Sequence, residues 1–384
     1  MKKIVILSCL WFLLLFLSCS HKNSVHKEKS DENWCIFRGD AALTGSTPLA
    51  LPDNPILLWS FKSDIYTKSS PVVYQQVAYW SSRRGNIFGV DLEGKQVFRF
   101  DMETATDATP MIYDSVLYIG RMDGYMCAIS LKKQEILWSF ETYGQIMASP
   151  NRIDFEGNEA IIFGSYDNQV YGLNSKDGKL LNRFESGFYI NGAVAKSGNF
   201  IVYGGCDGFV RIVDCILGVQ TDSLDVEIYI PASPAIHNHQ CYIADHSGNL
   251  YEINIKEGKI ESYKKIIESK DDNSTFVSVP AVSDKMVYVV SDDRYVYALN
   301  RKDGAVVWKY LLKGDTGESS PVVCKDKLLV CTKSGIVTIL HAKTGAFLWE
   351  YDTGEQIIAC PAVIKGYFYI LSQKGTLFCF GKNS

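Results

Sequence analysis

Short runs of apolar residues alternate with polar turns along the chain from about residue 56 to residue 381, and this pattern repeats. A small residue and a proline precede an apolar run at seven places: Ser70-Pro71, Thr109-Pro110, Ser149-Pro150, Ser233-Pro234, Val279-Pro280, Ser320-Pro321 and Cys360-Pro361. Residues 191–194 (Asn-Gly-Ala-Val) form a degenerate copy in the long interval before Pro234. The eight anchors are 39 to 46 residues apart. This period is typical of the four-stranded blade of a β-propeller.

Each repeat predicts the same succession of strands and turns. The proline begins a first strand, where its missing N–H costs little. An aromatic or β-branched strand follows, as in residues 200–203, and then a turn such as Asp207-Gly208, in which glycine accepts positive φ. A third strand ends in a second turn, as in Lys302-Asp303-Gly304. These signals predict two hairpins in each blade.

The fourth strand of each repeat carries a large apolar residue, at Trp59, Phe98, Trp138, Phe184, Leu224, Tyr263, Trp308 and Trp349. We interpret Trp59, Trp138, Trp308 and Trp349 as structural residues that dock one blade on the next. Trp59 lies before the first anchor, and no equivalent follows residues 376–380, so we expect residues 56–61 to supply the last outer strand. The sequence therefore predicts an all-β fold, an eight-bladed β-propeller of four-stranded antiparallel blades over residues 56–384, closed by an N-terminal strand. A seven-bladed ring with a loose N-terminal strand is the alternative.

The first residues of the chain read as a targeting signal. Lys2 and Lys3 precede an apolar run over residues 4–17, which is shorter than the about 20 residues that a spanning helix needs. Residues 15–19 (Leu-Phe-Leu-Ser-Cys) resemble the lipobox of bacterial lipoproteins, which implies a signal peptide over residues 1–18 and lipidation of Cys19. An ordinary signal peptide is the alternative. We expect residues 19–33 to form a flexible tether, residues 34–55 to lead into the propeller, and the protein to face the periplasm from a membrane of the bacterial cell envelope.

Charge and cysteine content narrow the choice of partners and ligands. The chain has 39 Lys and Arg against 43 Asp and Glu, so it lacks the basic surface that nucleic acids require. Nine cysteines remain after Cys9 and Cys19, an odd number at low density, and no Cys-x-x-Cys spacing occurs. Most of them lie in apolar strand patterns, as in residues 125–129. We interpret them as small buried hydrophobic residues.

The repeats carry a family resemblance. Residues 299–308, in which Leu-Asn is followed by glycine, an apolar run and tryptophan, resemble the PQQ-like repeat named for the quinoprotein dehydrogenases. Residues 34–40 (Trp-Cys-Ile-Phe-Arg-Gly-Asp) with Thr44-Gly45 resemble the opening of many such propeller proteins. The lipid tether, eight blades and short loops together resemble the BamB family. That resemblance implies a non-catalytic scaffold that contacts an outer-membrane barrel insertase, with the outer membrane favoured over the inner.

Catalysis has weaker support in the sequence. Quinoprotein dehydrogenases typically combine Ca²⁺, a catalytic aspartate, a tryptophan under the cofactor and often a vicinal cysteine pair. This chain has no Cys-Cys pair and no long insertion, and Asp271-Asp272-Asn273, its dense acidic-amide cluster, is interpreted as a solvated loop. His237 and His239 lack an identifiable third metal ligand. We predict no catalytic residue, metal or cofactor; a PQQ-dependent dehydrogenase and a carbohydrate-binding propeller are the alternatives.

The predicted partner site lies where the loops that lead into the inner strands converge on the propeller axis. The residues three positions before each anchor are Lys68, Asp107, Met147, Tyr189, Pro231, Val277, Glu318 and Ile358. Their mixture of charged, apolar and aromatic side chains suits a protein or peptide. We predict that Lys68, Asp107, Tyr189 and Glu318 bind the partner, with the aromatic residues Tyr66, Phe188, Tyr229 and Phe276 extending the surface. Simple filling of the channel is the alternative.

Overall fold

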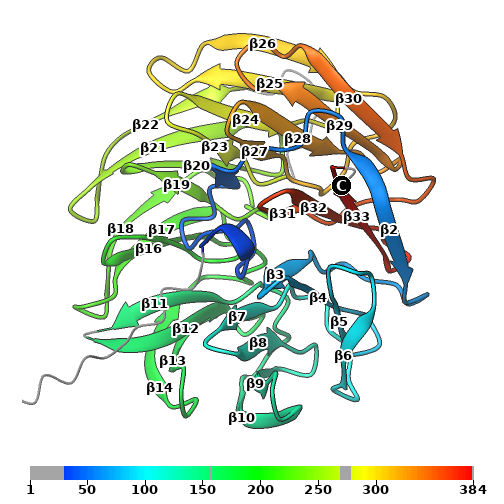
Figure 1. The fold of residues 1–384 in the computed structure, drawn as a ribbon. Helices are drawn as coiled ribbons and strands as arrows, with labels where there is room; N and C mark the ends of the chain where they lie inside the picture. The colour runs from blue at the N-terminus through cyan, green and yellow to red at the C-terminus, as the bar shows by residue number, and fades with distance from the viewer. Residues whose placement is uncertain (1–29, 156, 269–277, 383–384) are drawn as a thin grey trace, which may run out of the picture.

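Eight β-sheets stand around a common centre in the computed structural model, which describes residues 30–155, 157–268 and 278–382 (Figure 1). These residues form 33 strands and one 3₁₀ helix, η1 (Ser30–Glu32). The predicted all-β, eight-bladed fold is confirmed, and the seven-bladed alternative is excluded. The predicted signal peptide, Cys19, the cluster at 271–273, Phe276 and Val277 lie outside the described residues. No helix in the described ranges is both long and apolar enough to cross a membrane.

The first four blades follow the chain without interruption. The first contains β3 (Val72–Tyr74), β4 (Val77–Ser81), β5 (Asn86–Val90) and β6 (Gln96–Asp101), and the second contains β7 (Met111–Tyr113), β8 (Val116–Gly120), β9 (Tyr125–Ser130) and β10 (Glu135–Glu141). The third contains β11 (Asn151–Phe155), β12 (Asn158–Gly164), β13 (Gln169–Asn174) and β14 (Leu180–Glu185), and the fourth contains β15 (Ala195–Ser197), β16 (Phe200–Gly204), β17 (Phe209–Asp214) and β18 (Val219–Asp225).

The next three blades repeat this order. The fifth contains β19 (Ala235–His237), β20 (Gln240–Ala244), β21 (Leu250–Lys256) and β22 (Lys259–Ile267), and the sixth contains β23 (Ala281–Val282), β24 (Met286–Val290), β25 (Tyr295–Asn300) and β26 (Val306–Leu311). The seventh contains β27 (Val322–Cys324), β28 (Lys327–Cys331), β29 (Ile336–His341) and β30 (Phe347–Asp352). A short fifth strand, β1 (Ser46–Thr47), pairs in parallel with β27 in this blade.

The eighth blade closes the ring with strands from both ends of the described chain. It contains β31 (Ala362–Ile364), β32 (Tyr367–Leu371) and β33 (Thr376–Gly381), with β2 (Ile56–Lys62) as its outer strand. β2 runs antiparallel to β33, and Leu57 lies opposite Phe380 in the register. The predicted closure by an N-terminal strand is therefore confirmed.

The hydrophobic core lies between neighbouring blades. The second and third strands of a blade are apolar on both faces because each face packs against another sheet. One buried cluster, for example, joins Tyr79 and Phe98 of the first blade to Ile112, Leu117 and Cys127 of the second. This arrangement explains why these strands read as nearly continuous apolar runs in the sequence.

Three of the four predicted docking tryptophans cover the turn between the third and fourth strands of the following blade. The indole Nε1 of Trp138 donates to the carbonyl of Ser175 (3.0 Å), and that of Trp308 donates to Ala342 (3.0 Å). Trp59, in the outer strand of the eighth blade, donates to Leu92 of the first (2.6 Å). In the eighth blade no turn joins the third strand, β33, to the outer strand, β2. Trp349 therefore packs edge-on against Phe380 of that blade instead (5.6 Å between ring centroids).

Tyr263 lies in the fourth strand of its blade, as the sequence indicates, but it does not pack against the next blade. Its side chain is 54% exposed, and Ile266 instead packs against Gly304 of the next blade. β22 is nine residues long and carries two register shifts in its pairing with β21. The second shift lies at Ile266 and has no counterpart in the other outer strands, and Ile266 is the side chain that meets the next blade.

Hydroxyl groups at the proline anchors join neighbouring blades around the centre. The backbone N–H of Ser70 donates to Thr109 Oγ1 (2.8 Å), and that of Cys360 donates to Ser70 Oγ (2.9 Å). Ser233 and Ser320 accept in the same way from Ala193 and Val279 (2.8 Å each). The small residue before the proline therefore provides an acceptor for a buried N–H as well as space.

Candidate functional site

The anchors of the blades surround a central cavity of about 350 Å³. Its wall consists of Lys68, Ser70, Asp107, Met147, Ser149, Tyr166, Asn191, Gly192, Ala193, Pro231, Ala232, Ser233, Val279, Glu318, Ser320, Ile358 and Cys360, together with Phe37 from the lead-in segment. Lys68, Asp107 and Glu318 thus lie together at the cavity, as the sequence predicted. Tyr189 does not line the cavity. Its ring stacks on that of Tyr166, which does, with 4.9 Å between ring centroids.

We call the end of the central cavity that carries Lys68, Asp107 and Glu318 the mouth. Its charged side chains differ in exposure and in their contacts within the chain. The Asp107 side chain is only 3% exposed, and its two oxygens accept from Arg83 Nε (2.9 Å) and Nη2 (2.8 Å). This bidentate contact raises the pKa of the Arg83 guanidinium. Lys68 and Glu318 also line a second cavity of about 500 Å³, together with Lys333 and other residues. The mouth therefore offers both signs of charge.

Residues 30–47, which span the last four residues of the predicted tether and much of the predicted lead-in, close one end of the central cavity, and we call them the lead-in from here on. Trp34 exchanges two backbone hydrogen bonds with Val73 of the first blade (2.7 and 2.9 Å). The remaining blades each donate to a lead-in carbonyl: Ile112 to Cys35, Asn151 Nδ2 and Lys196 to Ala41, Ile236 to Ala42, Val282 to Thr44, Val323 to Gly45 and Lys365 to Asp31. The segment thus accepts a backbone N–H from seven blades and the side-chain amide of Asn151 from the third, and these donors would otherwise lack an acceptor at the axis.

Exposed aromatic side chains gather beside the mouth, in the loops between the third, fourth and fifth blades. We call Tyr166, Phe188, Tyr189, Tyr229 and His246 the aromatic patch. Phe188 and Tyr189 are 46% and 41% exposed with ring centroids 4.3 Å apart, and Tyr229, 40% exposed, stacks on His246 at 4.3 Å. The backbone N–H of Cys206 donates to the Tyr189 carbonyl (2.9 Å). Burial raises the pKa of Tyr229, and the Cys206 thiol is a smaller cause of the same shift.

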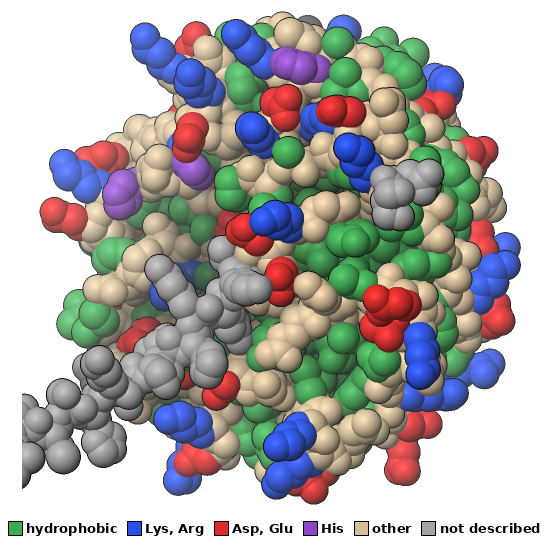
Figure 2. Space-filling view, viewed as in Figure 1, with side chains coloured by type: hydrophobic (Ala, Val, Ile, Leu, Met, Phe, Trp, Pro, Cys, Tyr) green, Lys and Arg blue, Asp and Glu red, His purple; other side chains and the backbone are tan. Residues whose placement is uncertain are grey.

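The molecular surface carries no dominant charge sign in the view of Figure 2, where Lys and Arg alternate with Asp and Glu around the rim and hydrophobic surface lies nearer the centre. A phosphate-rich partner would need one large basic surface. The mixed surface suits a protein partner better.

The residues at the cavity do not fit PQQ and its Ca²⁺. No tryptophan lines the cavity. In the described ranges, no three His, Cys, Asp or Glu side chains are grouped so that they could hold a metal ion. Asp107 already forms an ion pair with Arg83, and His237 contacts Asp284 (3.0 Å). We therefore derive no chemical step through such a cofactor.

Buried cysteine side chains are equally unsuited to chemistry. Burial raises the pKa of the Cys215, Cys241 and Cys379 thiols to about 12. Seven of the nine described cysteines are buried. The thiols of Cys215, Cys241 and Cys379 therefore stay protonated at neutral pH.

Sequence reasoning missed several residues at the mouth. Arg83 follows no repeat signal, and nothing marked its pairing with Asp107. Tyr166 lies in the turn between β12 and β13, where the sequence pattern predicts a hairpin and no functional residue. Its hydroxyl donates to Asn191 in the degenerate fourth anchor. The serine and threonine anchors were recognised as small residues, and their repeated hydroxyl groups were the signal for the contacts between blades.

These features define a β-propeller of PQQ-like repeats with a channel closed at one end. The family described as outer membrane protein assembly factor BamB matches residues 53–187 and 269–384, more than half of the chain, and the chain belongs to that family. Outer membrane protein assembly factor BamB of Yersinia pestis is 20% identical over 386 residues, covering 90% of this chain and 94% of its own.

Other sequences and solved structures are also similar to this chain. Tetrathionate hydrolase of Acidithiobacillus ferrooxidans is 25% identical over 64% of this chain, which spans only 48% of that relative. The crystal structure of BamB from Moraxella catarrhalis matches with a TM-score of 0.70 at 20% identity, covering 86% of this chain and 98% of that one. Quinohemoprotein alcohol dehydrogenase from Comamonas testosteroni matches with a TM-score of 0.76 at 13% identity, covering 93% and 82%. At these identities the structural matches establish the fold alone.

Proposed function

We propose that this protein is a non-catalytic, lipid-anchored propeller scaffold of the bacterial cell envelope, with a BamB-like role in outer-membrane protein assembly. Its partner is an envelope protein, and an outer-membrane barrel insertase is the specific candidate. Membership of the BamB family supports this role. The unsuitability of the cavity for PQQ and Ca²⁺ supports a scaffold over a dehydrogenase.

The aromatic patch is the observation that carries the proposal. Exposed Phe and Tyr side chains that are already stacked bury a large area and lose little side-chain entropy on binding. Such residues contribute most of the binding energy in protein interfaces, while charges at the rim select the partner. Phe188 and Tyr189 provide the aromatic centre, and Lys68 and Glu318 line the central cavity.

The position of the lead-in leaves this surface accessible. The inner strands begin at the central cavity, and the lead-in pairs with residues further along them, such as Val73 and Ile112. The tether therefore leaves the propeller away from the mouth. If Cys19 carries lipid, the ten residues 20–29 between it and the lead-in can extend at most about 36 Å, so the mouth is able to meet a partner near the membrane.

Affinity purification tests the scaffold. The tagged, lipidated protein is purified from detergent-solubilised membranes of its own organism, and the bound proteins are identified and quantified by mass spectrometry. We expect a barrel insertase to be recovered, and the double substitution Phe188→Ser with Tyr189→Ser to reduce it at least tenfold. Tyr263→Ser is the matched control, because Tyr263 is equally exposed but lies on the outer strand β22. Equal recovery with all three proteins would refute the proposed surface.

Three measurements address the anchor and the rival functions. Cys19→Ser should abolish labelling by a fatty-acid analogue and release the protein from membranes; persistent labelling would refute the predicted site. Titration with PQQ in the presence of Ca²⁺ should show no binding, and a glycan array should retain no protein. Saturable binding in either assay would favour the corresponding alternative function.

A further inference from the structure

Adjacent apolar side chains are exposed together at the start of three outer strands, β10, β26 and β30. Their exposed fractions lie between 39% and 52%. In the fourth blade, Leu217 is 69% exposed in the turn just before β18. Single exposed apolar residues are common in soluble proteins, but pairs that recur at one position of the repeat are not explained by chance exposure. We call these side chains the apolar rim: Ile136, Leu137, Leu217, Val306, Val307, Phe347 and Leu348.

A β-bulge accounts for the exposure of two neighbours at once. In a regular strand successive side chains point to opposite faces, so one member of each pair would turn toward the next blade. The pairing of β10 with β9 shifts register between Ile136 and Trp138, and β26 and β30 shift at the equivalent position, just before Trp308 and Trp349. The extra residue breaks the alternation, so the tryptophan docks on the next blade while both residues before it remain exposed.

The position of the rim along the propeller axis follows from the turns of each blade. We call the turn between the first and second strands the first turn, and the turn between the third and fourth strands the second turn. In the second blade the N–H of Leu131, in the second turn, donates to the Ser115 carbonyl of the first turn (3.0 Å). Ala342 donates to Asp326 in the same way in the seventh blade (2.8 Å). Both turns, and the rim that follows the second turn, therefore lie at one end of the propeller.

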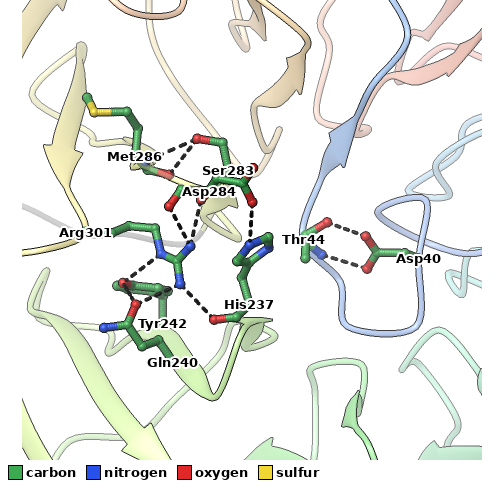
Figure 3. Close-up of polar contacts among 9 residues, drawn as sticks. All are labelled: Asp40, Thr44, His237, Gln240, Tyr242, Ser283, Asp284, Met286 and Arg301. Atoms are coloured by element: carbon green, nitrogen blue, oxygen red, sulfur yellow. Dashed lines mark hydrogen bonds and ion pairs between the residues drawn. The ribbon is translucent and has the colours of Figure 1, made fainter.

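Figure 3 shows a side-chain contact between the same two turns in the sixth blade. Arg301 lies in the second turn, and its Nη1 donates to the carbonyls of Ser283 and Asp284 in the first turn (3.0 Å each). Its Nη2 donates to the His237 carbonyl at the end of the inner strand of the fifth blade (2.8 Å). The turns of neighbouring blades are thus held together at this end.

The lead-in lies at this end as well. The N–H of Gln75, in the first turn of the first blade, donates to Asn33 Oδ1 (2.8 Å), and that of Lys365, in the first turn of the eighth, donates to the Asp31 carbonyl (2.8 Å). The mouth lies at the opposite end, where the loops lead into the inner strands. If Cys19 carries lipid, the end that bears the rim is therefore the end held near the membrane.

The rim surrounds the ring instead of forming one patch. Figure 1 shows β10 and β26 on opposite sides of the propeller, and β18 and β30 belong to two further blades. A protein partner of ordinary size covers about 800 Å² on one part of a surface. A broad, flat surface such as a lipid bilayer can meet opposite sides of the ring at the same time.

Lysine side chains accompany the rim. The exposed lysines in the second turns before the three apolar pairs include Lys132, Lys302 and Lys343. Residues 131–135, 301–304 and 342–345 each contain one more Lys or Arg than Asp or Glu, although the whole chain has a net charge of −4. Lysine beside apolar side chains suits anionic lipid, because its stem covers apolar surface while its ammonium group reaches the headgroups.

We propose that the apolar rim and these lysines rest on a phospholipid bilayer with anionic headgroups. The rim side chains enter the interface between headgroups and acyl chains, and the lysines contact the lipid phosphates. The propeller then stands on its lead-in end and presents the mouth to its partner. This contact adds to the lipid anchor of the proposed function and does not require it, because the side chains that make it belong to the propeller.

Vesicle flotation tests the rim on a protein without lipid. The protein begins at residue 20, so it lacks Cys19 and keeps every described residue, and the vesicles contain phosphatidylethanolamine and phosphatidylglycerol. We expect the wild-type propeller to bind. The combined substitutions Leu137→Ser, Leu217→Ser, Val307→Ser and Phe347→Ser should reduce binding at least about tenfold, because they remove apolar area from the interface.

Phe188→Ser with Tyr189→Ser is the matched control, because these side chains are similarly exposed but lie at the mouth. This protein should float as the wild type does. A wild-type protein that does not float, or a rim variant that floats equally well, would overturn the proposal and leave the rim to a protein partner. Recovery of a barrel insertase through the mouth is measured separately, so either proposal can fail without the other.

Hydrogen exchange of the wild-type protein decides the matter even if the rim variant does not fold. Vesicles should slow amide exchange in residues 131–137 and 342–348 and leave exchange in residues 186–191 unchanged. Slower exchange in residues 186–191 alone, or no change in any of these segments, would also overturn the proposal.

Discussion

Trp138 packs its indole ring on Gly178 across the boundary between the second and third blades. A Cβ added to Gly178 would lie 2.6 Å from Cε3 of the ring. The same contact recurs between Trp308 and Gly345, where the corresponding distance is also 2.6 Å. The tryptophan and the glycine of the repeat are therefore two halves of one contact, although they belong to successive blades.

Gly178→Ala should destabilise the protein more than its backbone conformation alone explains. Gly354 provides the matched control, because both glycines have φ of +69° but nothing lies within 4 Å of a Cβ at Gly354. We expect Gly354→Ala to cost about 1–2 kcal/mol for the left-handed backbone. Gly178→Ala should cost about 1–3 kcal/mol more, because the added methyl displaces the indole. Equal midpoints in urea-induced unfolding would show that the Trp138 contact contributes nothing.

Ser320→Ala should test the hydroxyl contacts between blades. The substitution leaves the buried N–H of Val279 without its acceptor, which costs about 1–3 kcal/mol. Ser149 is the control, since it lines the same cavity and accepts no hydrogen bond from a neighbouring anchor in the described residues. Urea-induced unfolding should give a smaller loss for Ser149→Ala. A loss as large as that of Ser320→Ala would contradict this role of the hydroxyl.

Substitutions of the two carboxylates at the mouth should have different effects, one on stability and the other on partner binding. Asp107→Asn should lower the free energy of unfolding by about 1–2 kcal/mol, because it weakens the contact with Arg83, whose side chain is 44% exposed and screened by water. Glu318 is exposed, so Glu318→Gln should change stability by less than about 0.5 kcal/mol and weaken partner recovery instead. Chemical denaturation and the affinity purification measure the two effects separately. A loss of stability in Glu318→Gln and a loss of partner recovery alone in Asp107→Asn would contradict this interpretation of the site.

Buried thiols should make the protein less stable at alkaline pH. The pKa of Cys241 rises from an ordinary value of 9.0 to about 12 on burial. Between these values the unfolded state loses a proton that the folded state keeps, so stability is fully present below pH 9 and falls as pH rises. The slope from one such thiol is about 1.4 kcal/mol per pH unit. Denaturation series at pH 9, 10 and 11 under reducing conditions should show a shallower slope for Cys241→Ala, by about that amount; an unchanged slope would exclude this linkage.

The sequence predicted features that repeat and missed features that occur once. The spacing of the anchors gave the blade number, and the unmatched Trp59 gave the closing strand, because each rests on a phase counted many times. The contact between Arg83 and Asp107 joins two loops and has no counterpart in the other repeats. The composition of β22 does not indicate which of its side chains meets the next blade, which is Ile266 and not Tyr263.

The lead-in also changes how the ring can come apart. In a repeat protein whose units contact only their neighbours, stability is approximately a sum of local terms, and an end blade can open alone. Here one segment of fewer than twenty residues is hydrogen-bonded to every blade, including pairs on opposite sides of the axis. Loss of any blade therefore releases a hub shared by the other seven. We expect unfolding to be a single cooperative event, with disruption spreading across the diameter as readily as around the circumference.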